Sequence, residues 1–79
     1  MSEDIFIEIN NMKEILNQNI IYSNASKDNI IKAKKIHNEL GIMLSIWTDD
    51  ENIKTLTEDD KKNILNTTKL IIKKAKELL

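Results

Sequence analysis

Apolar residues recur at spacings of three and four in three separate stretches of this 79-residue chain. That spacing gathers them on one face of an α-helix, whereas a half-buried strand needs strict alternation. Only short polar stretches separate the three, and short connections favour antiparallel neighbouring helices. The sequence therefore predicts one all-α domain over residues 1–79, a small three-helix up-down bundle.

The first predicted helix covers about residues 3–22. Ser2, followed by two acidic residues, has the form of a helix N-cap. Ile5, Ile7 and Ile9 also alternate as in a short strand, but the alternation stops there while the helical spacing continues. The apolar stripe of this helix consists of Ile5, Ile9, Met12, Leu16 and Ile20.

The second predicted helix covers about residues 27–47, with Ser26 as its N-cap. Its apolar stripe consists of Ile30, Ala33, His37, Leu40, Leu44 and Trp47. Further apolar residues widen this face and indicate contacts on two sides; they are Ile36, Met43 and Ile46. Gly41 costs about 1 kcal/mol relative to Ala in an exposed helix interior. Its presence predicts close approach of a neighbouring helix or a local bend.

The third predicted helix covers about residues 58–78. Thr57 supplies the N-cap, carboxylates fill the first turn and lysines follow, an order that matches the helix dipole. Its buried stripe consists of Ile64, Leu65, Thr68, Ile71, Ile72, Ala75 and Leu78. The polar connection before it gains a turn of helix if Thr48 and Glu51 form a capping box.

The size of the chain sets its expected stability. Below roughly 70–80 residues a core rarely supplies more than about 3–5 kcal/mol without disulfides, metal or association. The chain has no Cys, so association as a homodimer is an expected source of stability. No apolar run approaches the ~20 residues of a membrane span, and residues 1–4 are acidic where a signal peptide is basic. We expect a cytoplasmic protein with no membrane partner.

Few residues in this sequence are of the types that take part in catalysis. The single histidine, His37, lies on the apolar stripe, which favours a packed imidazole over a general base. One His without Cys makes no zinc site, and the carboxylates lack the spacing of a calcium loop. A single Gly cannot form a phosphate-binding loop. We expect no enzyme, no cofactor and no metal.

Opposite charges occupy separate blocks of the chain. Residues 47–60 hold six acidic residues and one Lys, whereas residues 61–79 hold six Lys and one acidic residue. A tryptophan at a helix end beside an acidic stretch resembles the apolar anchor and polar rim of a protein interface. The predicted partner-binding residues are Trp47, Asp49, Asp50, Glu51, Ile42 and Ile46.

The lysines support an alternative, a dimeric repressor that binds nucleic acid through the Lys face of the third helix. Lysine side chains neutralise phosphates, and those predicted to do so are Lys69, Lys73, Lys74 and Lys76, with Lys32, Lys34 and Lys35 from the second helix. The chain has no Arg to read a base edge, and its pI is about 5.8. Nucleic acid is therefore the less favoured partner.

The stretch from His37 to Leu44 resembles the Ser-Gln-x-Leu-Asp-x-Leu-Ile helix of the sporulation-linked phosphatases that act on phosphorylated response regulators. Gly41 stands at that family's Asp and His37 at its Ser, so the resemblance does not imply phosphatase activity. In composition and helix count the chain is similar to the cytosolic bacteriocin-immunity bundles of low-GC Gram-positive bacteria, which implies a second alternative.

The amino-acid composition of the chain is narrow. The chain holds 15 Ile, 12 Lys and 10 Asn but no Arg, which indicates an AT-rich coding source, such as a low-GC bacterium or its phage or plasmid. The absence of a catalytic set and the wide apolar face of the second helix favour a non-enzymatic regulator or inhibitor that binds a partner protein.

Overall fold

The computed structural model describes residues 3–79, and no strand occurs in that range. Its elements are α1 (Glu3–Leu16), a π-helical turn η1 (Asn17–Ile21), α2 (Lys27–Thr48), α3 (Asp50–Thr55) and α4 (Glu58–Leu78). The predicted all-α class is confirmed. The described residues form four α-helices where the apolar spacing predicted three, because the connection before α4 contains α3. The predicted cap at Ser2 lies outside the described residues.

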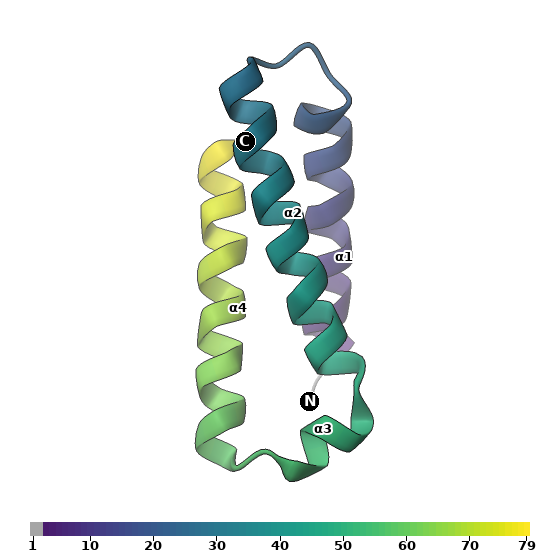
Figure 1. The fold of residues 1–79 in the computed structure, drawn as a ribbon, viewed down its shortest axis with the longest axis vertical. Helices are drawn as coiled ribbons and strands as arrows, with labels where there is room; N and C mark the ends of the chain where they lie inside the picture. Colours follow the sequence, from purple (N-terminus) through teal and green to yellow (C-terminus); the bar gives the residue numbers. More distant parts are fainter. Residues whose placement is uncertain (1–2) are drawn as a thin grey trace.

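The helices form a rod that measures 43 × 16 × 16 Å (Figure 1). α1 and α4 run in one direction and α2 runs in the other, so the first turn of α1 and all of α3 lie at one end and the C-terminus lies at the opposite end. α2 packs against both α1 and α4 along its length, and α1 and α4 also contact each other.

The first helical segment ends as the sequence predicted, but its last turn is π-helical. The amide of Tyr22 donates to the carbonyl of Asn17 at 2.9 Å, five residues back. This wider turn lets both Ile20 and Ile21 pack on the core, although they are adjacent in sequence. The strand alternative is wrong, because Glu3–Leu16 is an α-helix, in which Ile7 is 56 % exposed while Ile5 and Ile9 are buried.

α2 continues through Gly41 without interruption. A Cβ atom at Gly41 would meet only the Lys13 ammonium, at 3.9 Å. None of the described residues, Gly41 included, has a positive φ. The prediction that this glycine permits the close approach of a neighbouring helix is therefore wrong.

Side-chain caps fix where the later helices begin. Asp49 caps α3 by accepting from the amide of Asn52 at 3.1 Å. Thr48, the predicted cap, instead donates its hydroxyl to the carbonyl of Leu44 at 2.9 Å and remains in α2. Thr57 caps α4 as predicted, and together with Asp60 it forms a reciprocal capping box.

The core lies where the three apolar stripes meet along the rod. Every stripe residue predicted for the first helix is buried, and the buried residues of α2 and α4 also come from their predicted stripes. The core residues are Ile5, Ile9, Met12, Leu16, Ile20, Ala33, Leu40, Trp47, Thr68, Ile71, Ile72 and Ala75. Every buried side-chain N or O atom in the described residues has a hydrogen-bond partner.

Candidate protein-interaction face

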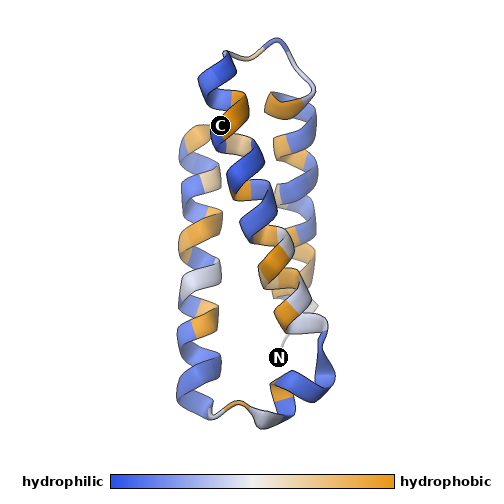
Figure 2. Cartoon of the chain, in the orientation of Figure 1, coloured by the Kyte–Doolittle hydropathy of each residue, from blue (hydrophilic) through white to orange (hydrophobic). Residues whose placement is uncertain are grey.

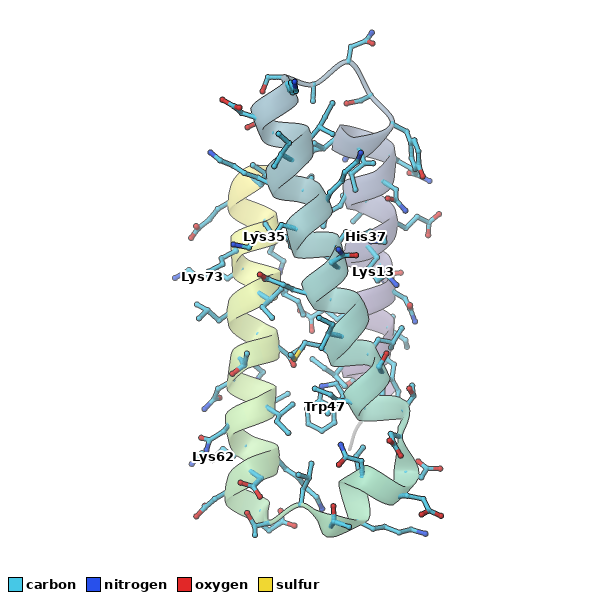
Figure 3. The ribbon with its side chains drawn as sticks, in the orientation of Figure 1. Lys13, Lys35, His37, Trp47, Lys62 and Lys73 are labelled. Carbon is cyan, nitrogen blue, oxygen red and sulfur yellow. The ribbon has the colours of Figure 1, made fainter. Side chains whose placement is uncertain are left out.

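Trp47 lies in the core and not at a surface. Its side chain is 1 % exposed and points from α2 toward α4 (Figure 3). The indole Nε1 donates to the Thr68 hydroxyl at 3.3 Å, and that hydroxyl donates to the carbonyl of Ile64 at 2.8 Å. The prediction of Trp47 as a surface anchor is wrong, because the packing of α4 against α2 covers the indole and satisfies its donor.

One long face of the rod is formed by parallel stripes of α2 and α4. Each stripe has the three-four spacing that keeps side chains on one side of a helix. The two stripes adjoin at one end, where residues of both helices line a groove. The α2/α4 face, as we call it, consists of Lys32, Lys35, Glu39, Ile42 and Ile46 from α2 and Thr67, Leu70, Lys74 and Glu77 from α4.

The groove has a volume of about 320 Å³ and lies between the N-terminal half of α2 and the C-terminal half of α4. Ile36 and Leu78 supply its apolar lining. Its charged lining consists of Lys32, Lys35, Glu39, Lys74 and Glu77. Because lysines and carboxylates alternate around an apolar floor, the groove suits a mixed protein surface better than a small anion.

The middle of the α2/α4 face is apolar and open to solvent. Ile42 is 57 % exposed and Leu70 is 52 % exposed, while Ile46 is partly exposed. Figure 2 shows the C-terminal half of α2 as more hydrophobic than its N-terminal half. Ile42 and Ile46 therefore both reach solvent, and their predicted role in binding a partner stays a prediction. Leu70 was missed, although it is an apolar residue that falls outside the buried stripe of its own helix.

The fold gathers the charge blocks at opposite ends of the rod. The N-terminal part of α2 and the C-terminal part of α4 share one end (Figure 1), and both are rich in lysine. The predicted acidic residues Asp49, Asp50 and Glu51 are all exposed at the other end, near the first turn of α4 with its three carboxylates. Among the side chains described, one ion pair is formed, between Lys61 and Glu58 at 3.4 Å.

The lysines predicted to bind nucleic acid do not share one surface. Lys69, Lys73 and Lys76 recur at spacings of four and three and are exposed on one side of α4. Lys73 and Lys62 point away from α2 in Figure 3. Lys74 lies instead in the groove against α2. The phosphate-binding set predicted from α4 is therefore divided between two sides of the helix.

His37 lies on the side of α2 that faces α1. Burial, and after it the positive charge of Lys13, lowers the pKa of His37 below its ordinary value of 6.5. Both causes favour the neutral imidazole. Within the described residues, no group of three or more His, Cys, Asp or Glu side chains is placed to hold a metal ion.

No helix within residues 3–79 has the length and apolarity needed to cross a lipid bilayer. The chain matches no protein-family model, no curated protein and no solved structure, so the α2/α4 face stands on its own residues as the candidate site.

Proposed function

We propose that this chain is a non-enzymatic regulator or inhibitor that acts by binding a protein through its α2/α4 face. The observation that carries the proposal is the pair of exposed apolar side chains, Ile42 and Leu70, on a face whose groove end carries both lysines and carboxylates. Such an apolar centre with a polar rim is the usual anatomy of a protein interface. In this proposal the chain is a cytoplasmic three-helix up-down bundle from a low-GC bacterium, phage or plasmid.

The acidic residues predicted from the sequence keep a role in the proposal. Asp49, Asp50 and Glu51 are exposed at the end of the rod where α3 begins. Charges at a rim raise the association rate and orient the partner, while the buried apolar contacts slow dissociation. The carboxylates therefore act as a steering surface, and Ile42 replaces Trp47 as the anchor.

The proposal is tested by immobilising the chain, identifying a captured host protein and measuring its affinity with both proteins purified. Ile42→Asp should weaken binding at least tenfold, because a carboxylate would have to be buried at the centre of the contact. Ile7→Asp is the matched control, since Ile7 is an equally exposed isoleucine on α1. Equal binding by both variants would contradict the proposal.

A repressor that binds nucleic acid is the second candidate, and the exposed stripe of Lys69, Lys73 and Lys76 on α4 favours it. The dependence of binding affinity on salt concentration distinguishes the two candidate functions. Binding to phosphates falls steeply between low and physiological salt, whereas a contact anchored by apolar side chains changes much less. Replacing these three lysines by Gln should abolish nucleic-acid binding and leave protein binding intact. An immunity-like function would be one form of the inhibitor proposed above.

A further inference from the structure

We infer that the α2/α4 face receives an amphipathic helix of the partner protein, laid along the groove between α2 and α4. The inference rests on the proposed function, because it names the element of the partner that this face recognises. The partner helix carries two apolar side chains two turns apart, with an acidic and a basic side chain opposite the charges of the groove.

The charged side chains around the groove have no ionic partners within the described chain. Three lysines and two glutamates line the groove, yet the one ion pair within residues 3–79 joins Lys61 to Glu58, outside it. The groove charges are therefore available to charges on another molecule. Because both signs are present, the complementary surface carries cations as well as anions, as a protein does and the phosphate backbone of a nucleic acid does not.

The lining of the groove favours a helix over other ligands. Five of its seven lining residues are charged, whereas pockets for small molecules are mostly apolar. A bound strand needs a sheet edge, and residues 3–79 contain no strand. A proline-rich segment needs an aromatic lining, and no aromatic residue lines this groove. A helix that places its apolar side between two helices is the recognition mode that fits these residues.

The hydrogen bond between Trp47 and Thr68 fixes which residues of α2 and α4 lie at the same level. The two helices are antiparallel (Figure 1) and rise equally per residue, so steps back from Trp47 match steps forward from Thr68. By this count Leu78 lies level with His37, and Leu70 lies level with Ser45.

The apolar side chains of the face lie at two such levels. The first is the floor of the groove, formed by Ile36 and Leu78. The second is the exposed pair Ile42 and Leu70. The two levels are about seven residues apart, or ~10 Å at the rise of an α-helix. Two turns of a partner helix span the same distance, so its residues seven apart contact both levels.

The same register places the charges of the groove. Lys32 and Lys35 precede the first apolar level, whereas Glu39 and Glu77 lie between the two levels. The partner helix therefore needs an acidic side chain about one turn before its first apolar residue and a basic side chain about one turn after it. Lys74 follows the glutamates and accommodates a further acidic side chain beside the second apolar level.

The first experiment measures the affinity of the purified chain for labelled Ala-rich peptides of about 20 residues, long enough to form a helix. The matched peptide carries two Leu residues seven apart, with Glu three residues before the first Leu and Lys three residues after it. The exchanged peptide has the Glu and the Lys interchanged. The matched peptide should bind at least tenfold more tightly, because the exchanged one opposes like charges. Equal affinities for the two peptides overturn the inference.

The second experiment reverses the charges of the groove. Glu39→Lys combined with Glu77→Lys should reverse the preference, so that a peptide with Glu in place of its Lys binds more tightly than the matched one. Glu8→Lys combined with Glu14→Lys is the control, since it makes the same change in net charge at exposed positions of α1. Circular dichroism checks that both variants remain helical. Equal shifts in preference for the two double variants overturn the inference.

Sedimentation equilibrium identifies a different occupant of the face. The wild type should be a monomer that binds one matched peptide. A dimer that Ile42→Asp dissociates, and that binds no peptide, would make a second copy the occupant and overturn the inference.

Failure of this inference can be told from failure of the proposed function. If Ile42→Asp abolishes capture of a host protein while the purified chain does not distinguish the peptides, the inference fails and the proposed function stands. If the chain selects the matched peptide while Ile42→Asp leaves the capture of host proteins unchanged, the inference stands for the groove and the proposed function fails.

Discussion

Trp47 and Thr68, 21 residues apart in sequence, share a buried hydrogen bond between α2 and α4. The indole Nε1 donates to the Thr68 hydroxyl at 3.3 Å. Both side chains are fully enclosed, so no solvent is available to replace either partner. This bond fixes how α4 lies along α2 at the end of the rod opposite the groove.

Thr68→Val should destabilise the fold, because Val keeps the shape of Thr but leaves the indole N–H without an acceptor. A buried donor without a partner costs about 1–3 kcal/mol. In a domain of this size each kcal/mol lowers the melting temperature by about 4–8 °C. Thermal unfolding followed by circular dichroism gives the difference. Thr67→Val is the control, since Thr67 is the exposed neighbour on the same helix, and an equal loss in both variants would contradict the prediction.

Gly41→Ala should stabilise the chain by up to about 1 kcal/mol. The helix continues through this position, and the added Cβ would make only an ordinary contact with the flexible end of Lys13 at 3.9 Å. Urea unfolding measures the change. Asn38→Ala, at an exposed position one turn earlier in α2, should give a smaller gain. A loss of stability at Gly41 would show that the space beside it is needed.

Protonation of His37 should weaken the fold below neutral pH. Burial and then Lys13 lower its pKa in the folded state below 6.5, so the unfolded chain binds the proton more readily. Above pH 6.5 both states are neutral at this residue and it contributes no pH dependence. As the pH falls from 6.5 through the lower folded pKa, the free energy of unfolding should decrease, and it should then level off for this group.

Urea unfolding of the wild type and of His37→Asn, compared between pH 5 and 7, isolates this contribution from that of the carboxylates. Lys13→Met should narrow the pH range over which the free energy of unfolding falls. It should not abolish that fall, because burial is the larger cause of the lowered pKa of His37. Parallel pH profiles for the wild type and His37→Asn would refute the prediction.

Thr57→Ala should cost about 1 kcal/mol, within the 0.5–2 kcal/mol range of lost N-caps. The Thr57 hydroxyl accepts from the Asp60 amide at 3.1 Å, and the Asp60 carboxylate accepts from the Thr57 amide at 3.2 Å. Urea unfolding measures the loss. Thr55→Ala provides the comparison, because Thr55 is exposed nearby and bonds only within α3. Equal effects at the two positions would show that the capping box is not a stabilising contact.

The sequence by itself determined the three long helical segments and the residues that they bury. Both follow from local rules, namely the spacing of apolar residues and the caps Ser26 and Thr57, which act within one turn. The local rules failed at Thr48 and Asp49, where two adjacent residues competed to cap α3. They also failed at Gly41, where they predicted the close approach of a neighbouring helix and the structure shows none.

Only the tertiary structure decided which side chains face solvent where two helices meet. Periodicity gives the direction of each stripe within its helix but not the rotation of one helix against another. Packing of α4 on α2 therefore buried Trp47, left Ile42 and Leu70 exposed and separated Lys74 from the other lysines of α4. The antiparallel course of α2 brought charge blocks far apart in sequence to shared ends of the rod, because contacts between distant segments exist only after folding.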